Sequence, residues 1–454
     1  MKKRLLCLCM SAILALGLFA ACGGGATTGG DATGGGAAPP VAGAEVSERP
    51  FEGVTISVLV PATPYVDTLR RNIQEFTDLT GIRVDFEQLE NDQLSNRIAV
   101  NAAAGGTELD VIFYRPIQEN LAFTARGWLE NLDPFIAAAG DDYNYMDFTE
   151  SAREITSANG SAFGIPLVTE RMVVQFNIDM LAQVGYDSIP DTFDEFVALC
   201  EALLEAGITP LGIRGEGNAA VTQFSGFLYG FGGDFIDYDT GTALINTDEF
   251  IRALQFYGML ADRFAPMGVL NAGWPETQNW FAQGQVAMRI DADSQYAYAL
   301  DPNASLVYDR VGYGVIPGET RAARAPFSIV AWAVGISSGS RNTEASWEFI
   351  RWATSKEMDV IAQQEGNFSA RHSTWANPEA SRYIPPSLVV VVEESNQIAR
   401  PFDRPYMENA AEARAAIGTL ITMAIEGVTE EQLRAAAEDV NALVQRLLDE
   451  ERNA

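Results

Sequence analysis

The side chains that could carry out nucleophilic or metal-assisted chemistry are few in this chain. His372 is the only histidine among 454 residues, so any histidine-activated serine or cysteine nucleophile would have to be built around it. Zinc sites made from several histidines or cysteines are excluded by their number, and no Walker phosphate-binding loop is present. We therefore expect no catalytic residues, no metal site and no cofactor.

Carboxylates are the one abundant reactive group. The chain has 61 aspartates and glutamates, and two that converge in space would suffice for glycoside hydrolysis. Their separation cannot be read from the sequence, so a carbohydrate-active enzyme tethered to the membrane stays open as an alternative to a binding protein. Such an enzyme would consume its sugar, whereas a receptor would leave it intact.

The charge balance bears on the choice of partners. The formal net charge is −31, and Lys356 is the only lysine beyond residue 3. A surface of this sign repels phosphate backbones, so we expect no nucleic-acid partner. The charge says little about a neutral ligand.

The cysteine at position 22 suggests a covalent modification. Lys2–Arg4 form a positive head, an apolar run extends from Leu5 to Phe19, and two small alanines precede Cys22. This layout is typical of an export signal. The small residues before Cys22 resemble the lipobox of bacterial lipoproteins, although Phe19 stands where leucine is usual. The resemblance implies that Cys22 is lipidated and holds the protein on the outer side of the cell membrane.

The N-terminal region divides accordingly into two segments. Residues 1–21 are predicted to be a signal peptide, and residues 22–48, rich in glycine, alanine, threonine and proline, a flexible tether. An ordinary signal peptide and an uncleaved membrane anchor both stay open. Cys200 is then the only cysteine of the folded part, which excludes an internal disulfide, and its place on the apolar side of a helical pattern predicts a core residue.

The folded part begins with predicted strands that alternate with a predicted helix. "GVTISVLVP" (53–61) reads as a strand, "DTLRRNIQEFTDLTG" as a helix closed by Gly81, and "IRVDFEQLE" as a second strand. "LDVIFYR" (109–115) reads as a short buried strand. Ligands of open parallel sheets collect at the carboxyl ends of strands, so residues 61–65 and 114–115 are expected near a ligand.

Two threonines indicate where later helices begin. Thr192 precedes "FDEF" and is followed at helical spacing by Glu195, the pattern of a capping box. Thr429 precedes a long amphipathic stretch at the C-terminus. The leucines of that stretch are predicted to pack in the core.

An ordered series of segments resembles a known family. It runs through "GWLENLDPF", "GSAFGIPLVTERMVVQFNIDMLAQVGYDSIPDTFDEFVALCEAL", "WFAQGQVAMRID", "GYGVIPG" and "AWAVGISSGSRNTEASWEFIRWATSKE". In this order and at this spacing the segments are similar to those of bacterial extracellular solute-binding proteins of the sugar-binding, maltose-binding-protein-like group. The resemblance extends from about Phe51 to the C-terminus.

The resemblance implies the α/β fold of type II periplasmic binding proteins. Two lobes, each a mixed sheet flanked by helices, are joined by hinge strands expected near residues 165–170 and 329–335. The approximate expected lobes are residues 51–165 plus 333–370 for the first, and residues 166–332 plus 371–454 for the second.

The same resemblance implies a function without chemistry. A sugar or oligosaccharide would be enclosed between the lobes by hinge closure and delivered to the permease subunits of an ABC importer. We expect a monomeric binding protein and not an enzyme. A sensor subunit with the same fold and a receptor for another solute class stay open.

The resemblance also implies ligand-binding positions. Glu170 matches a ligand-contacting carboxylate of maltose-binding-like proteins, and its structural alternative is a salt bridge with Arg171 or another arginine. Tyr114 matches a stacking aromatic residue, while "RPIQ" after it departs from the maltose-binding pattern. The full set of expected ligand-binding residues is Glu170, Tyr114, Arg115, Tyr65, Trp274, Asp291, Trp332 and Arg371. His372 is expected on the surface or at the cleft edge.

Overall fold

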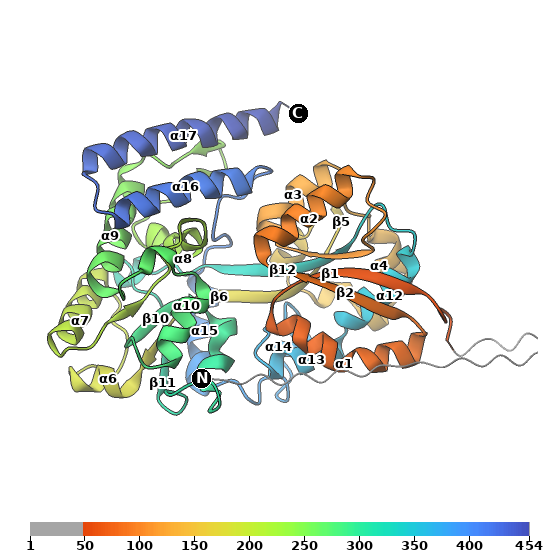
Figure 1. The fold of residues 1–454 in the computed structure, drawn as a ribbon, viewed down its shortest axis with the longest axis horizontal. Coiled ribbons are helices and arrows are strands. Elements are labelled where there is room, and N and C mark those ends of the chain that lie inside the picture. Colours follow the sequence, from red (N-terminus) through yellow and green to blue (C-terminus); the bar gives the residue numbers. More distant parts are fainter. Residues whose placement is uncertain (1–48, 454) are drawn as a thin grey trace, which may run out of the picture. The chain divides into compact units, whose positions relative to one another are not determined.

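The computed structural model describes residues 49–453 (Figure 1). The predicted signal peptide, the lipidation site at Cys22 and the tether lie outside these residues. The strands are β1 (Thr55–Pro61), β2 (Arg83–Leu89), β3 (Val111–Tyr114), β4 (Ser157–Ala158), β5 (Ser161–Ala162), β6 (Ile165–Asn177), β7 (Leu211–Gly212), β8 (Ile236–Asp237), β9 (Thr242–Ala243), β10 (Met288–Ala292), β11 (Val311–Gly314) and β12 (Ser328–Ile336).

Helices surround the strands throughout the fold. The helices are α1 (Pro64–Thr80), α2 (Asn91–Ala103), α3 (Pro116–Ala125), α4 (Asp133–Tyr143), α5 (Glu150–Ile155), α6 (Ile178–Gln183), α7 (Phe193–Glu205), α8 (Gly217–Gly230), α9 (Asp248–Phe264), α10 (Trp274–Ala282), α11 (Tyr296–Leu300), α12 (Thr343–Ala353), α13 (Lys356–Gln364), α14 (His372–Trp375), α15 (Pro386–Ile398), α16 (Ala410–Ile425) and α17 (Glu430–Arg452). Across residues 49–453, none of them combines the length and the apolar character that crossing a bilayer requires.

Eight of the strands form one mixed sheet in the order β2-β1-β3-β12-β6-β10-β7, with β11 also paired to β6, whereas β4-β5 and β8-β9 form two separate two-stranded sheets. In the first half of the sheet, β1 is parallel to both β2 and β3, and α1 connects β1 to β2. Gly81 ends α1 in the left-handed conformation at φ 81° and donates its N–H to the Thr77 carbonyl. The predicted β-α-β unit and its glycine stop are therefore confirmed.

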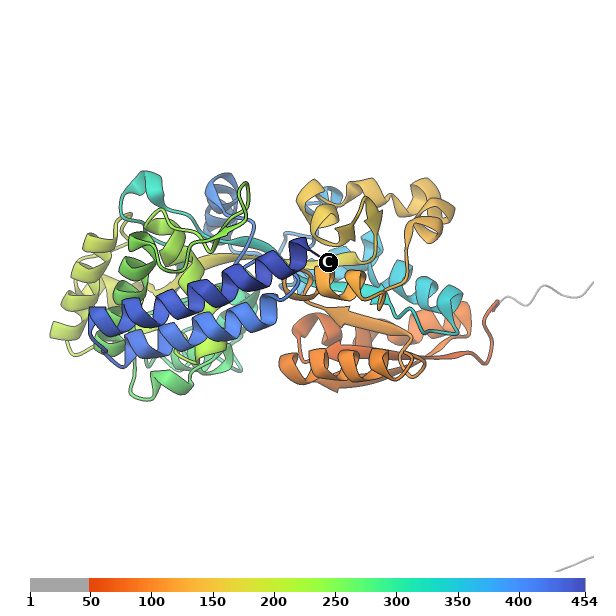
Figure 2. The same ribbon diagram turned by 90° about the horizontal axis from the view of Figure 1, so that it is seen from above.

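The second half of the sheet is built around β6 and β10, which run antiparallel, while β7 runs parallel to β10. Both threonine caps are confirmed: Thr192 Oγ1 accepts from Glu195 N at 3.3 Å, and Thr429 caps α17 in a box with Gln432. Cys200 is fully buried in α7, as predicted. Figure 2 shows α16 and α17 side by side over this half.

Two long strands, β6 and β12, pass between the halves (Figure 1). The first part of β6 pairs with β12 and its last part with β10, whereas the end of β12 pairs with β3. The β6–β12 register shifts on both sides of Trp332. Such irregularities change the direction in which side chains point. This one lies where the two strands pass from one half of the fold to the other.

The expected lobe boundaries lie within or near these connections and stay a prediction. Helix α14 packs against α13 in the first half, and α15 packs against β6 and β11 in the second. The chain therefore makes its third passage between the halves at residues 376–385, a few residues after the expected boundary at 370/371. The third connection is a loop and not a strand.

Candidate functional site

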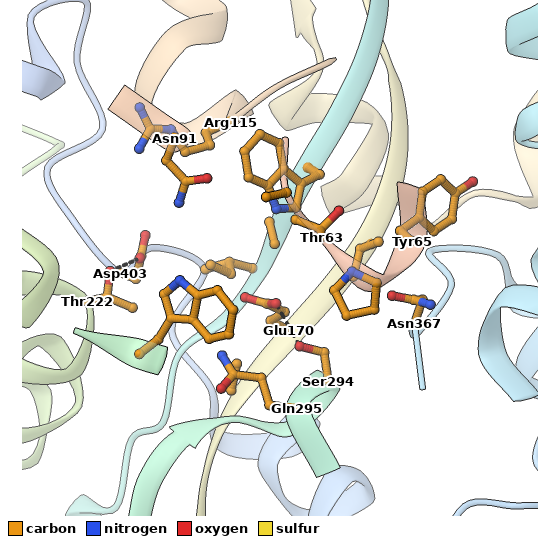
Figure 3. Close-up of a pocket in the computed structure, with 18 of the residues that line it drawn as sticks. Thr63, Tyr65, Asn91, Arg115, Glu170, Thr222, Ser294, Gln295, Asn367 and Asp403 are labelled. Atoms are coloured by element: carbon orange, nitrogen blue, oxygen red, sulfur yellow. Dashed lines mark hydrogen bonds between the residues drawn. The ribbon is translucent and has the colours of Figure 1, made fainter. Parts of the chain in front are cut away.

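A cavity of about 380 Å³ lies where the two halves meet at β6 and β12 (Figure 3). Its first wall comes from residues 62–65 after β1, from the start of α2 and from Arg115 after β3. Its second wall includes Arg214 after β7 and Ser294 after β10. The carboxyl ends of two pairs of parallel strands thus meet at the cavity, the usual place for a ligand in α/β sheets.

Glu170 of β6 lies at the centre of this cavity (Figure 3). Its Oε1 accepts a hydrogen bond from Ser294 Oγ at 2.7 Å. The salt bridge considered as its structural role is not formed, because Arg171 pairs with Asp293 at 2.6 Å. Among the described residues no ion pair involves Glu170, which leaves its second oxygen available to a ligand.

The environment of Glu170 favours the neutral acid. Burial raises its pKa to about 7, against which the Ser294 hydrogen bond acts, while Asp293 and Asp291 add to the increase. Near neutral pH, Glu170 can therefore accept or donate a hydrogen bond. Both abilities suit a hydroxyl group, which itself donates and accepts.

This pKa predicts a pH dependence of stability. The folded protein keeps a proton on Glu170 up to about pH 7, whereas an unfolded chain loses it near 4.5. The contribution of Glu170 to stability is therefore greatest in acid and is lost as the pH rises through 7. Between pH 5.5 and 8.5 the free energy of unfolding should therefore fall by about 1–3 kcal/mol more in the wild type than in Glu170→Gln.

Thermal unfolding of ligand-free wild type and Glu170→Gln at these two pH values measures this effect. Other titrating groups contribute equally to both proteins and cancel in the comparison. Equal changes in midpoint for the two proteins would contradict the raised pKa.

Four buried arginines line the cavity: Arg115, Arg214, Arg404 and Arg414. Arg115 donates to Glu119 Oε1 at 2.9 Å, and Arg214 is paired with Asp291. Arg404 is paired with Asp403, whose Oδ2 also accepts from Thr222 Oγ1 at 2.7 Å. Asn91 and Arg115 face Thr222 and Asp403 across the cavity in Figure 3.

Aromatic side chains complete the lining. Trp332 of β12 and Trp274 at the start of α10 both border the cavity, as does Tyr298 of α11, which is 39% exposed. Tyr65 also lines it, while its hydroxyl donates to the Ala353 carbonyl at 2.6 Å. Aromatic faces beside hydrogen-bonding groups suit ligands that have both apolar C–H faces and hydroxyls.

A second cavity, of about 740 Å³, is lined by the alternate residues of the crossing strands. Val168 and Glu170 border the first cavity, whereas Thr169 and Arg171 border the second. Successive strand residues point to opposite faces, so the two cavities lie on opposite sides of β6. His372, expected on the surface or at the cleft edge, is exposed and borders the second cavity.

Residues 62–360 match a family model described as bacterial extracellular solute-binding protein. That span is more than half of the chain. The chain belongs to the bacterial extracellular solute-binding proteins. Members of this family are binding proteins that act outside the cytoplasm, which agrees with the expected class and location.

Curated relatives of this solute-binding protein include two with stated ligands. It is 26% identical over 340 residues to the erythritol/L-threitol-binding protein of Mycolicibacterium smegmatis, covering 71% of each chain. It is 25% identical over 310 residues to the mannitol-binding protein of Pseudomonas aeruginosa, covering 67% of this chain and 69% of the relative.

Solved structures confirm the expected two-lobe fold of this solute-binding protein. Maltose-bound MalE3 of T. maritima matches with a TM-score of 0.78 at 22% identity, covering 86% of this chain and 100% of the other. A solute-binding protein of Agrobacterium radiobacter K84 in complex with ribitol matches with a TM-score of 0.79 at 21% identity, covering 87% and 99%.

Five of the eight expected ligand-binding residues of this solute-binding protein border the first cavity. They are Glu170, Arg115, Tyr65, Trp274 and Trp332. The fold brings them together from β6, β12 and the segments after β1 and β3, and from the start of α10. Whether they contact a ligand stays a prediction.

The other three expected residues do not border it, and their surroundings give the reasons. Tyr114 ends β3 with its side chain fully buried, and its hydroxyl donates to Asn120 Oδ1 at 2.9 Å. Because Arg115 directly follows it, the two side chains point in opposite directions, and the arginine is the one at the cavity.

Arg371 is fully buried within the first half. It donates to the Thr354 carbonyl at 2.8 Å and to the Asn144 carbonyl at 3.1 Å, pairs with Asp359 at 3.1 Å, and lies 3.8 Å from the Phe148 ring centre. These contacts fix several segments of the first lobe to one another. Arg371 therefore does not border the first cavity, and its contact with a ligand stays a prediction.

Asp291 lies behind the cavity wall and holds an arginine that forms it. The carboxylate pairs with Arg214 and, at 3.0 Å, with Arg289, and it accepts from Gln223 Nε2 at 3.2 Å. Burial alone would raise its pKa, but the two guanidinium groups outweigh burial and hold the pKa below its usual value. Asp291 is thus a positioning residue for Arg214.

The cavity residues that the sequence did not reveal are mostly in the second half. The polar and charged ones of the second half include Arg214, Thr222, Gln278, Ser294, Asp403, Arg404 and Arg414. One signal was present: Arg414 stands in the buried stripe of α16 among Ala410, Ala413 and Ile417. A lone charged residue on an apolar helix face is a candidate functional position, because burying a charge is costly.

Proposed function

We propose that this protein is the extracytoplasmic binding component of an ABC importer and captures a sugar or sugar alcohol between its two lobes. The observation that carries the proposal is the cavity at the junction of the lobes, with Glu170 at its centre and without an ion-pair partner among the described residues. The ligands named for the relatives, erythritol or L-threitol, mannitol, ribitol and maltose, support a polyhydroxylated ligand.

The size of the cavity favours a small ligand. Its volume of about 380 Å³ is near the lower end of the range for small-molecule sites. A single sugar ring, a short polyol or a disaccharide suits this space better than a long oligosaccharide. Trp274 and Trp332 would cover apolar faces, and Glu170 would bind hydroxyls.

Capture proceeds by hinge closure about β6, β12 and the loop at residues 376–385. A ligand that bonds groups from both walls binds the closed state better than the open one, so binding shifts the population toward closure. The lobes in this mechanism are approximately residues 51–165 plus 333–370 and residues 166–332 plus 371–454, except that α14 (His372–Trp375) packs with the first lobe. The permease then recognises the closed form and receives the ligand.

The binding reaction needs no catalytic residue, and we propose that the protein is not an enzyme. Besides Glu170, three carboxylates line the cavity: Asp403 is paired with Arg404, Glu365 is paired with Arg71, and Glu90 is exposed on the first wall without an ion pair among the described residues. Glycoside hydrolysis would require a second uncommitted carboxylate at a fixed distance from Glu170. The pairing of Asp403 and Glu365 leaves Glu90 as the one other carboxylate, and recovery of the ligand intact is what would support a receptor.

The location follows from the N-terminal pattern and the family. We propose that residues 1–21 direct export, that Cys22 carries the lipid, and that residues 22–48 tether a monomeric receptor beside its permease. The net charge of −31 supports the absence of a nucleic-acid partner.

Thermal unfolding against a panel of polyols, monosaccharides and disaccharides, with chromatography of each mixture, tests this function. A ligand at about 100 times its dissociation constant adds roughly 2.7 kcal/mol, which raises the midpoint by about a degree or more. We expect a shift with a ligand that is recovered intact. A consumed ligand would establish an enzyme, and no shift with any member would contradict the proposed ligand class.

A further inference from the structure

One wall of the cavity carries more positive than negative charge. Arg404 and Arg414 lie there with a single carboxylate, Asp403, and all three are at least nine-tenths buried. Asp403 is bound by Arg404 through both of its oxygens and by Thr222. We call these three charged residues the Arg404–Asp403–Arg414 group.

Arg414 is the group's uncompensated member. Its Nη1 donates to Gln118 Oε1 at 3.1 Å and its Nη2 to Thr222 Oγ1 at 3.1 Å, both neutral acceptors. Its Nε has no hydrogen-bond partner, and no described carboxylate lies within ion-pair distance of its guanidinium. Burial, together with the charge of Arg404, lowers its pKa well below the usual value.

The arrangement of the helices accounts for this position. Helices α8 and α16 approach so closely that a Cβ on Gly217 would lie 2.8 Å from the Gly418 carbonyl. This contact brings Arg414 of α16 beside Thr222 of α8. Gln118 belongs to α3 of the first lobe and accepts from both Arg404 and Arg414, so the group lies directly on the boundary that closes around a ligand.

A second charge group adjoins the same cavity. Arg214, which borders it, and Arg289 share one carboxylate, Asp291, while Arg289 Nη1 has no partner. In both groups two guanidinium ions face one fixed carboxylate. A buried charge without a counter-ion is costly, and a ligand that supplies the counter-ion removes that cost.

We propose that the ligand is a sugar acid whose carboxylate binds against Arg414, beside hydroxyls bound by Glu170. The proposal rests on the proposed function, since it specifies the ligand of the same cavity. A carboxylate matches the planar fork of a guanidinium, and its single negative charge equals the excess of the Arg404–Asp403–Arg414 group. The overall charge of −31 opposes an anion at long range but is screened by salt beyond about 8–10 Å.

The test compares matched ligands that differ in one group. Calorimetry measures the affinity of the wild-type protein for D-glucose, D-glucuronate and D-glucose 6-phosphate. The same measurement compares D-galactose with D-galacturonate and D-mannitol with D-mannonate. The quantity of interest is the affinity of each acid divided by that of its neutral parent. We expect this ratio to be at least about ten for one pair, as a charge-assisted hydrogen bond implies.

Three variants assign that preference to Arg414. In Arg414→Gln the acid-to-parent affinity ratio should fall at least tenfold, and the binding of the neutral parent that remains shows that the site is folded. Arg414→Lys keeps the charge and should retain part of the preference. Arg263→Gln is the control, because it removes the same charge from an exposed arginine of α9 that does not border the cavity.

Each outcome has a distinct meaning. Binding of neutral sugars with no preference for the acid, or a preference unchanged in Arg414→Gln, overturns the sugar-acid proposal and leaves the proposed function standing. A preference for the phosphate that Arg414→Gln removes keeps the anion site but overturns the carboxylate. Absence of binding by every sugar, charged or neutral, overturns the proposed function and this proposal with it.

Discussion

Glu170→Ala should weaken ligand binding by more than tenfold while the protein stays folded. The carboxyl is central in the cavity, is held by Ser294 at 2.7 Å, and has an oxygen left for the ligand. A hydrogen bond to the ionised carboxylate is worth about 1.5–3 kcal/mol, which corresponds to roughly ten- to hundredfold in affinity, so the comparison is made above pH 7. Calorimetry with the ligand that gives the largest thermal shift measures this loss.

Two further variants make the result specific. Glu170→Gln keeps the shape and one acceptor, so it should bind with an affinity between those of wild type and Glu170→Ala. Glu205→Ala, on an exposed residue at the end of α7 outside the cavity, should bind like wild type. Unchanged affinity in Glu170→Ala would remove Glu170 from the binding site.

The largest loss of stability is expected from Asp291→Ala. This change leaves Arg214 and Arg289 buried without their shared carboxylate, and breaking a buried ion pair from one side costs about 3–5 kcal/mol. The unfolding midpoint should fall by roughly 5 °C or more, with a loss of ligand affinity because Arg214 is no longer held at the cavity wall. Thermal unfolding and calorimetry on the same sample measure both effects.

Asp262→Ala is the matched control, since Asp262 is exposed on α9 and belongs to no ion pair of the described residues. It should unfold within about a degree of wild type. If Asp291→Ala lost affinity with an unchanged midpoint, Asp291 would be a ligand contact, as the sequence had suggested, and the positioning role would be wrong.

The elements that sequence predicts well here are those set by local chemistry. The glycine at the end of α1 and the threonine caps of α7 and α17 act within a few residues, and each is present. Glu170 could be proposed because a carboxylate in an otherwise apolar crossing strand has no obvious structural role. These features require no knowledge of distant contacts.

Which of the expected residues border the cavity depends on the direction of each side chain and on partners that are distant in the sequence. Tyr114 and Arg115 are neighbours, and only the pleat of β3 decides that the arginine borders the cavity. Arg371 donates a hydrogen bond to the Tyr143 carbonyl and pairs with Asp359, and no local pattern in the sequence reveals these partners. The contact of Gln118 with Arg414 joins segments almost 300 positions apart, so the charged wall of the cavity exists only in the folded chain.

A crystal structure of the protein with its best-binding sugar or polyol would test the central claim most directly. The account predicts one intact ligand in the cavity of about 380 Å³, bonded to Glu170 and in contact with both walls, including Arg115 and Trp274. A ligand on the opposite side of β6, in the cavity bordered by His372, or one bound to a single lobe away from Glu170, would contradict it.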